Sequence, residues 1–273
     1  MSEKTVEVHP ETWVALEDCG LPQPYTKTFG FDGDFINDFH AMLAHAPTGR
    51  MGIPVCIDIG IDGYLQRGDA LKLYELAYFS NSDVMELGTH KGLSTSIIAR
   101  ALADAGSIGR LETDDIDADA NRIAKANLAD NPGAARVNFN LEYAVPFMDR
   151  LIREGRKFGF IFVDHWHGYD ETRNAAIRVH KLLVDGGFVL FHDYNDIESR
   201  NPDHPHKVYQ AVANTIVKDP RFHFCAVSGC CVLFRKLSWW EGCWRRLSRP
   251  RAHPFTTGTT STTPAAGARA SIG

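Results

Sequence analysis

One short segment brings together side chains that could carry out acid–base chemistry. FIFVDHWHGYDE, at residues 160–171, passes from large apolar residues directly to Asp164, His165 and His167. A carboxylate at the end of a buried strand is costly unless a partner compensates its charge. A neutral imidazole titrates near pH 7 and can therefore take a proton from a hydroxyl group. The segment predicts a catalytic edge at the end of this strand.

A glycine-containing loop, VMELGTHKGLST at residues 84–95, predicts a binding site for a small ligand. Gly88 permits a tight turn, and Gly92 allows the following helix to begin close to a ligand. The helix N-terminus offers free N–H groups to a carboxylate, and Glu86 can accept hydrogen bonds from a cationic amine. The loop lacks the spacing of dinucleotide and phosphate loops, and a plain turn stays open as an alternative. Its candidate cofactor-binding residues are Glu86, Gly88, Thr89, His90, Lys91, Gly92 and Ser94.

Two acids, Asp114 and Asp115, follow at the end of the next predicted strand. In nucleotide-binding α/β folds, an acid at this place meets ribose hydroxyls. Asp115 is the first candidate, and Asp114 and Asp117 compete with it. Asp117 suits the N-terminal cap of the next helix better. Asp114 and Asp115 are therefore the candidate cofactor-binding residues of this strand end.

These clusters need elements that bring them to one place, and an alternation of strands and helices supplies them. We expect strands at 83–87, 110–114, 135–140, 158–164, 188–193, 222–227 and 230–236. We expect helices at 34–45, 68–79, 92–105, 117–130, 145–155, 171–183 and 206–218, with Gly186 and Gly187 stopping the sixth. The alternation predicts an α/β fold: a Rossmann-like, open, mostly parallel seven-stranded sheet with helices on both faces and an antiparallel C-terminal hairpin. Ligands bind such sheets beyond the carboxyl ends of the strands, which is where the polar clusters fall.

The chain resembles the class I S-adenosylmethionine-dependent methyltransferases over about residues 57–236. VDHWHGYDE and GGFVLFHDY resemble the small-molecule family related to cephalosporin-biosynthesis methyltransferases and to metal-dependent sugar and macrolide O-methyltransferases. That family has an acid, two residues and then His-x-Tyr after the fourth strand, and HDY or DDY after the fifth. The matching residues are Asp164, His167 and Tyr169 in the first element, and His192, Asp193 and Tyr194 in the second. HKVYQAV also resembles the family's following helix.

The resemblance implies a divalent cation, with magnesium as the first expectation, bound by Asp164, His192 and Asp193. Two carboxylates that converge from adjacent strand ends would repel each other unless something cationic lay between them. Magnesium prefers oxygen ligands and keeps several waters, so two carboxylates suffice. His192 departs from the acid often found at its position. It makes manganese, iron or zinc conceivable, unless it only orients Asp193. A turn cap for Asp193 and a strand-end histidine without a metal are the structural alternatives.

The resemblance also implies roles for the other residues. S-adenosyl-L-methionine is the expected cofactor, held by the glycine loop, the acids at 114–115, Asp164 and His165. His167 and Asp164 are the catalytic candidates, with His167 as the base. The expected reaction is O-methylation of a small hydroxylated metabolite, a sugar or a natural product, assisted by the metal. The alternatives are a metal-independent methyltransferase, a non-haem iron oxygenase and a cofactor-binding subunit without turnover.

Composition limits the partners. The formal net charge of −5 argues against general nucleic-acid binding. The six cysteines form no CxxC pair, which disfavours a zinc ribbon or a redox site and favours core packing. The first residues have no apolar core of signal-peptide length, and no run reaches the ~20 apolar residues of a membrane span. We therefore expect a cytoplasmic enzyme with a small-molecule acceptor and no integral membrane association, and a homo-oligomer stays open.

The expected organisation has four parts. Residues 1–56 form an N-terminal extension with a short helix, and residues 57–236 form the methyltransferase domain. Residues 237–255 hold three tryptophans and several arginines, which predicts a peripheral helix packed on the domain, or a helix for a partner or membrane surface. Residues 256–273 are rich in Thr, Ala and Gly, a composition typical of disorder. Acceptor recognition is expected before residue 60 and in the 195–206 loop, whose His204 and His206 read as solvated or, as a minority option, as a lid.

Overall fold

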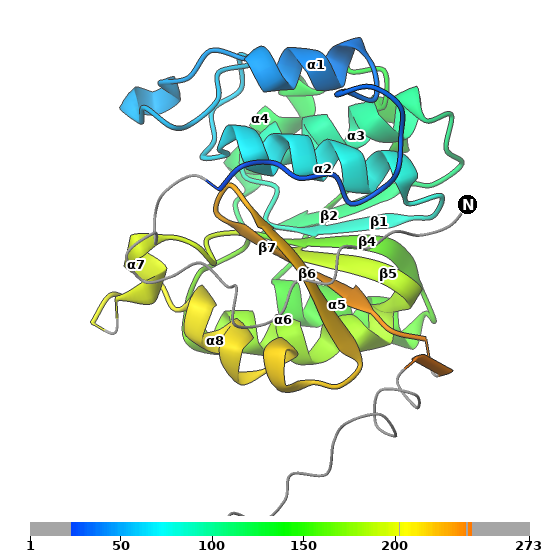
Figure 1. Cartoon of the computed structure of the whole chain (residues 1–273), viewed down its shortest axis with the longest axis vertical. Coiled ribbons are helices and arrows are strands. Elements are labelled where there is room, and N and C mark those ends of the chain that lie inside the picture. Colours follow the sequence, from blue (N-terminus) through cyan, green and yellow to red (C-terminus); the bar gives the residue numbers. More distant parts are fainter. Residues whose placement is uncertain (1–22, 202, 239, 242–273) are drawn as a thin grey trace, which may run out of the picture.

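A seven-stranded sheet forms the centre of the molecule, which a computed structural model describes for residues 23–201, 203–238 and 240–241. Its strand order is β3-β2-β1-β4-β5-β7-β6 (Figure 1). The strands are β1 Val84–Leu87, β2 Leu111–Asp115, β3 Val137–Leu141, β4 Phe158–Val163, β5 Leu183–Phe191, β6 Phe222–Ser228 and β7 Cys231–Lys236. Strands β1 to β5 pair in parallel, and β7 runs antiparallel between β5 and β6. The predicted fold is confirmed, and both strands of the hairpin belong to the sheet.

Helices cover both faces of the sheet (Figure 1). On one side lie α1 Asp38–His45, α2 Arg67–Phe79, α3 Leu93–Asp104 and α4 Ala118–Asn127. On the other side lie α5 Ala144–Arg153, α6 Tyr169–Leu182 and α8 Val208–Asn214. The short helix α7 Ile197–Arg200, which the sequence pattern did not predict, lies in the connection from β5 to α8.

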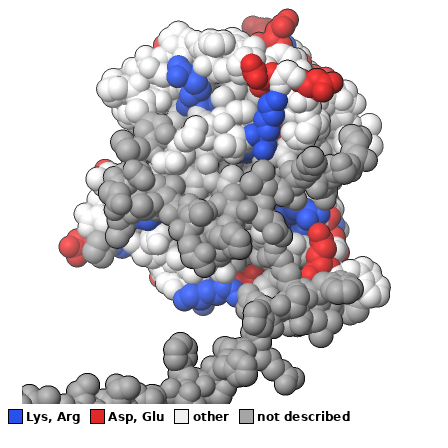
Figure 2. All heavy atoms as spheres, viewed as in Figure 1, with Lys and Arg blue, Asp and Glu red and all other residues white. Residues whose placement is uncertain are grey.

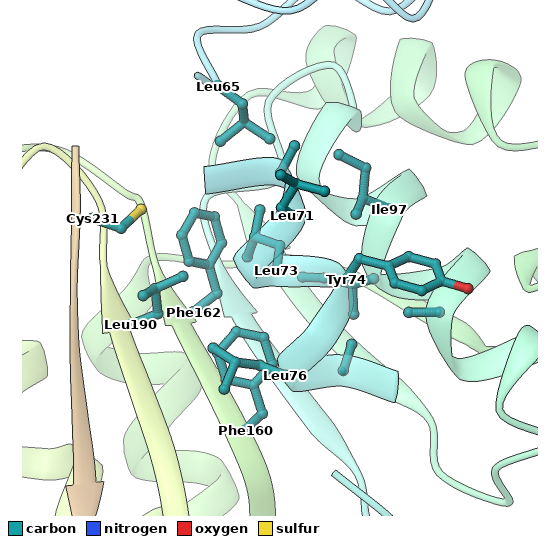
Figure 3. Close-up of a cluster of buried hydrophobic side chains, with 14 of the residues drawn as sticks. Leu65, Leu71, Leu73, Tyr74, Leu76, Ile97, Phe160, Phe162, Leu190 and Cys231 are labelled. Atoms are coloured by element: carbon teal, nitrogen blue, oxygen red, sulfur yellow. The ribbon is translucent and has the colours of Figure 1, made fainter. Parts of the chain in front are cut away.

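Strand β4 shows how the two layers of helices share one sheet. All six of its residues are buried. Phe160 and Phe162 pack with Leu73 in the core under α2 and α3 (Figure 3), whereas Ile161 and Val163 belong to the core under α5 and α6. Neighbouring side chains of a strand point to opposite faces. Burial of both faces therefore explains why this strand has an unbroken apolar sequence.

The prediction that Gly186 and Gly187 stop a helix is wrong. Helix α6 already ends at Leu182, and the two glycines lie inside β5. The first residue of β5, Leu183, is buried and pairs with Phe158 of β4. The register between these strands shifts just beyond this pair, and Gly186 has a φ of +80°. The glycines therefore serve an irregular strand, since glycine accepts this backbone conformation without a steric penalty.

The helix predicted at 206–218 is shorter than expected. It ends at Asn214, and one 3-10 turn, Ile216–Lys218, follows it. The break lies at Thr215, whose φ of −121° and ψ of −87° are not helical. Its hydroxyl donates a hydrogen bond to the carbonyl of Ala211 at 2.6 Å, a local contact of the kind that competes with helix continuation.

The described part of the predicted N-terminal extension packs on the sheet domain. Leu43 is fully buried in the core under α2, and Phe29 packs against the same cluster. The backbone N–H of Phe29 donates to Glu75 Oε1 at 2.9 Å, and Glu75 Oε2 forms a fully buried ion pair with Lys72 Nζ at 2.5 Å. A buried charge pair of this kind requires such hydrogen bonds to offset its desolvation.

Figure 2 shows charged side chains of both signs distributed singly and in small groups over one face. None of the helices in the described part of the chain combines the length and apolar character that crossing a membrane requires. The predicted tail at 256–273 and most of the predicted peripheral segment at 237–255 lie outside the described residues.

Candidate functional site

One cavity of about 860 Å³ lies at the carboxyl ends of β1, β2, β4 and β5. Strand β1 lies between β2 and β4, so the chain order reverses there, and this is where open α/β sheets bind ligands. The predicted site residues that line the cavity are Gly88, Thr89, His90, Ser94, Asp114, Asp115, Asp164, His165, His167, His192 and Asp193. Glu86, Lys91 and Gly92 belong to the same loop but lie outside the cavity wall.

Glu86 is fully buried and only half satisfied. Its Oε2 accepts hydrogen bonds from Thr95 Oγ1 at 2.6 Å and from Thr113 Oγ1 at 2.7 Å. Its Oε1 has no hydrogen-bond partner of good geometry among the described residues, while Ser94 of the cavity wall also bonds to this carboxyl. Burial raises the pKa of the Glu86 carboxyl to about 7. A buried polar atom without a partner is rare, so this oxygen is able to receive a cationic donor.

A side chain at either glycine of the loop would collide with another part of the protein. Gly88 has a φ of +96°, and a Cβ there would lie 2.2 Å from the carbonyl oxygen of Asp164. Gly92 has a φ of +88°, and its Cβ would lie 2.8 Å from Leu128 of the segment that follows α4. Gly92 does not line the cavity, and its role in bringing α3 close to a ligand stays a prediction. Lys91 is also turned away, because its Nζ pairs with Asp62 Oδ2 at 3.0 Å.

The acids at the end of β2 differ in their surroundings. Asp115 Oδ2 accepts the backbone N–H of His90 at 2.6 Å, so this residue ties the glycine loop to β2. Asp114 is buried, and burial raises the pKa of its carboxyl well above the usual range. Its Oδ1 has no hydrogen-bond partner within the part of the chain that the structure describes. Asp117 caps α4 by accepting N–H groups of Asp119 and Ala120, as predicted. Both Asp114 and Asp115 remain open to a ligand in the cavity.

The ends of β4 and β5 bring two acids and two histidines together. His192 Nδ1 lies 2.9 Å from Asp193 Oδ1 and 3.1 Å from Asp164 Oδ1. His167 Nε2 lies 3.1 Å from Asp193 Oδ2 and 3.4 Å from Asp164 Oδ1. His192 is buried, and despite these short distances its Nδ1 makes no hydrogen bond of good geometry to any described residue. Asp193 has a φ of +54°, a backbone conformation that is costly outside glycine and that turns its carboxylate into the cluster.

Each acid and histidine of this cluster shifts the pKa values of its neighbours. Burial raises the pKa of the Asp164 and Asp193 carboxyls, but His192 and His167 together lower it more, so both pKa values lie below the usual range. Burial lowers the pKa of His167, but the two carboxylates raise it more. The same balance raises the pKa of His192 well above the usual range. Two buried carboxylates thus demand positive charge between them.

Cys230 reaches the cavity although the sequence predicted it only as core packing, whereas His206 and His165 belong to segments that were expected near a ligand. Cys230, expected to be core packing, lines the cavity and places its Sγ 3.2 Å from His192 Nε2. His206, expected to be solvated, lines the cavity with its ring centroid 4.9 Å from that of His167. A lid formed by the loop of His206 stays a prediction. His165 lines the cavity as expected, and burial lowers its pKa to about 4.

The two tyrosines of the matching motifs do not line the cavity. Tyr194 is fully buried, with its ring 5.1 Å from that of Tyr209 on α8. Tyr169 begins α6, and its hydroxyl accepts a hydrogen bond from Asn214 Nδ2 at 3.4 Å. Both tyrosines contact α8 residues, so they position the connection that follows β5 rather than a ligand.

Known proteins resemble the part of the chain that contains this site. Residues 85–194 match the family model described as a methyltransferase domain. Caffeoyl-CoA O-methyltransferase 1 from Eucalyptus globulus is 27% identical over 164 residues, which cover 55% of this chain and 64% of the relative. The chain thus spans a little less than two thirds of that relative's length.

Solved structures show the same fold. The O-methyltransferase TomG from Streptomyces achromogenes, involved in tomaymycin synthesis and solved with SAM, has a TM-score of 0.55 at 20% identity, covering 74% of this chain and 91% of that chain. The O-methyltransferase from Bacillus cereus, solved with SAH, has a TM-score of 0.51 at 20% identity, covering 61% of this chain and 79% of that chain. At this level of identity the likeness concerns the fold.

Proposed function

We propose, from the premise that residues 85–194 are an S-adenosylmethionine-dependent methyltransferase domain, that the protein methylates a hydroxyl group of a small molecule with the help of a divalent cation. The observation that carries the proposal is the convergence of Asp164, His192 and Asp193 in the cavity that also holds the glycine loop. A closer relation to the cephalosporin-type and macrolide-type enzymes stays part of this proposal, as do a sugar or a natural product as acceptor.

The cofactor part of the proposal rests on the wall formed by β1, α3 and β2. The N-terminus of α3 offers N–H groups to the carboxylate of S-adenosylmethionine, and Ser94 lines the cavity there. The unpartnered Oε1 of Glu86 suits the cofactor's cationic amine. Asp115 suits the ribose hydroxyls, and His165 lines the part of the cavity next to the expected adenine.

The metal part rests on the spacing of three potential ligand atoms. Neighbouring ligands of an octahedral ion with bonds of about 2.0–2.1 Å lie about 2.9 Å apart. His192 Nδ1 lies 2.9 Å and 3.1 Å from the two carboxylate oxygens and makes no hydrogen bond with them. This donor set fits a cation, which when bound would orient the acceptor hydroxyl and lower its pKa.

The proposed base is His167. Its side chain lines the cavity, and its Nε2 faces Asp164 and Asp193. The two carboxylates raise the pKa of His167, and a cation shared by them would weaken that effect. His167 would then be neutral near pH 7 and able to accept the proton of the acceptor hydroxyl. The rest of the rate would come from holding the hydroxyl in line with the methyl group.

Two further segments of the cavity wall are candidates to contact the acceptor. Ile53, Val55 and Tyr64, from the segment before α2, line the cavity together with Glu198 and His206 from the connection between β5 and α8. We propose that these two segments contact the acceptor. The domain bounds of 57–236 remain a proposal too, because the preceding segment also contributes to the cavity.

A metal-free methyltransferase is the second candidate. Its support is that both histidines lie close to the two carboxylates, which raise the pKa of each imidazole. Protonated imidazoles would then supply the positive charge that the acids demand. The two candidates differ in whether a chelator changes turnover.

Calorimetric titration with S-adenosylhomocysteine, before and after chelation, tests the proposal. We expect saturable binding in both cases, because the glycine loop does not depend on the metal. Turnover, followed by S-adenosylhomocysteine release with a panel of hydroxylated acceptors, should fall after chelation and return when a divalent cation is added. The absence of cofactor binding would refute the methyltransferase. Turnover that survives chelation would favour the metal-free candidate.

A further inference from the structure

His192 has a second set of contacts on the side that faces away from Asp164. Its Nε2 lies 3.2 Å from Cys230 Sγ and 3.7 Å from Asp69 Oδ2. Asp69 lies in the first turn of α2, and Cys230 lies in the turn between β6 and β7. All three side chains are buried, so water does not compete for their hydrogen bonds.

The donors and acceptors of this group can be assigned from Asp69, whose carboxylate oxygens act as acceptors. Its Oδ1 accepts the backbone N–H groups of Cys230 at 2.9 Å and Cys231 at 3.2 Å, and its Oδ2 accepts the N–H of Gln66 at 2.8 Å. The packing around it is tight, since a Cβ at Gly229 would lie 2.2 Å from Asp69 Oδ1. The carboxylate of Asp69 therefore acts as an acceptor toward three backbone N–H groups.

The thiol of Cys230 lies between Asp69 and His192 and contacts both. Its Sγ lies 3.4 Å from Asp69 Oδ2 and 3.7 Å from Asp193 Oδ1, so the thiol donates its proton to a carboxylate in either orientation. The sulfur is then left as an acceptor, and Nε2–H of His192 is the donor that reaches it.

The proton on Nε2 leaves Nδ1 with a free lone pair between two carboxylate oxygens. We infer that Asp69 and Cys230 are positioning residues that hold His192 in this tautomer and make it a nitrogen ligand, so that the site selects a first-row transition-metal dication over magnesium. The inference rests on the metal part of the proposed function. Imidazole suits such metals, whereas magnesium prefers oxygen ligands. Outer contacts of this kind fix a ligating histidine in many metal sites.

The competing explanation is an imidazolium at His192 that neutralises the carboxylates by itself. In that case Nδ1 would also carry a proton. The neighbouring oxygens of Asp164 and Asp193 lie close enough to accept it but not in a direction that forms a hydrogen bond. A buried N–H without an acceptor is costly, so the observed arrangement suits a lone pair directed at a metal better.

The test is a metal titration of the purified full-length protein with Co²⁺, Mn²⁺ and Mg²⁺, followed by calorimetry and by the visible absorption of Co²⁺. We expect Co²⁺ and Mn²⁺ to bind more tightly than Mg²⁺. Cys230→Ala should weaken Co²⁺ binding by about 10–100-fold, the usual effect of losing such an outer contact. Cys230→Ser should keep most of the affinity, because a hydroxyl also both donates and accepts. Cys225→Ala, at a buried cysteine on β6, is the matched control and should change nothing.

Two further variants test the chain of contacts from its ends. His192→Asp should raise the affinity for Mg²⁺ relative to Co²⁺, since it restores an all-oxygen set. Asp69→Asn should resemble Cys230→Ala. The serine and alanine variants at Cys230 carry the test even where Asp69→Asn fails to fold, because they leave the cap of α2 intact.

The outcomes separate this inference from the function on which it rests. Equal affinities for Co²⁺ and Mg²⁺, or a Cys230→Ala variant that binds Co²⁺ like the wild type, would overturn it. A sulfur-to-cobalt charge-transfer band would overturn it as well, because Cys230 would then be a ligand rather than a positioning residue. If S-adenosylhomocysteine binds but no metal does, the inference and the metal part of the function fail while the methyltransferase assignment stands.

Discussion

Replacing Glu86 by glutamine removes the one buried charge that we assign to the cofactor's amine. The pKa of the Glu86 carboxyl rises from 4.5 to about 7 because the residue is buried. The folded protein therefore holds a proton between these pH values that the unfolded chain has lost. The stability from this group is fully present below pH 4.5, and it is lost as the pH rises through 7.

The size of the effect follows from that pH window. At about 1.4 kcal/mol per pH unit, the full difference amounts to about 3 kcal/mol. Glutamine is neutral at every pH, and its amide oxygen can still accept from Thr95 and Thr113. Glu86→Gln should therefore remove this pH dependence and make the ligand-free protein more stable than the wild type at pH 8.

Urea denaturation of both proteins at a series of pH values between 5 and 8.5 measures the effect. The free energy of unfolding of the wild type should fall more steeply with pH up to about 7 than that of Glu86→Gln, and the two slopes should agree above it. Asp114 is present in both proteins, so its own titration largely cancels in the comparison. Equal slopes across the whole range would refute the assignment of a raised pKa to Glu86.

The same variant links stability to cofactor binding. A cationic amine next to Glu86 favours the ionised carboxylate, so cofactor binding near pH 6.5 should release a proton. Calorimetry in buffers of different ionisation enthalpy counts that proton. Glu86→Gln should release none and should bind S-adenosylhomocysteine more weakly by about 1.5–3 kcal/mol, the range for a hydrogen bond to a charged group. Unchanged affinity would place the amine elsewhere.

Three further predictions concern the loop, the ribose and the base. Gly88→Ala should lower the free energy of unfolding by more than the control Gly106→Ala. Both glycines have a positive φ, which costs an alanine about 1–3 kcal/mol, but only at Gly88 would the added Cβ lie 2.2 Å from a backbone oxygen. Equal losses in denaturation would contradict the close approach. Asp115→Ala should weaken S-adenosylhomocysteine binding by about 1–3 kcal/mol in calorimetry, and a larger loss with Asp114→Ala would assign the ribose to that residue instead. His167→Ala should lower the rate by about 10²–10⁴, with partial recovery at high pH in a pH–rate profile, whereas a uniform loss at all pH values would indicate a positioning role.

The sheet could be predicted from the sequence because its strands carry local signals. The apolar run at residues 158–163 is buried on both faces, and the alternation of strands and helices predicted an open, mostly parallel sheet, whose strand order the structure supplies. The edge at which Asp164, His192 and Asp193 meet followed from that topology. The glycines at 186–187 were misread, because glycine marks a helix end and an irregular strand alike.

Side-chain direction within a loop had no such signal. Glu86, Lys91 and Gly92 stand in the same short motif as Thr89 and Ser94, yet only the latter two line the cavity. A residue's place along the chain shows which end of the sheet it occupies, but the turn decides which residues face the ligand. At Gly88 the deciding contact is the carbonyl of Asp164, which belongs to a different loop.

The contact between Cys230 and His192 shows what one further step of topology would have yielded. The hairpin was predicted, but the strand with which it pairs was not. Strand β7 runs antiparallel to β5 with Phe191 opposite Val232. Because the partners of an antiparallel pair run in opposite directions, the residues just after Phe191 must meet those just before Val232. The turn before β7 is therefore bound to reach the carboxyl end of β5, where the proposed metal site lies. Once β7 is placed next to β5, the register carries position 231 opposite position 192 and position 230 opposite position 193. Cys230 is thereby brought close to His192, although the two are far apart in the chain.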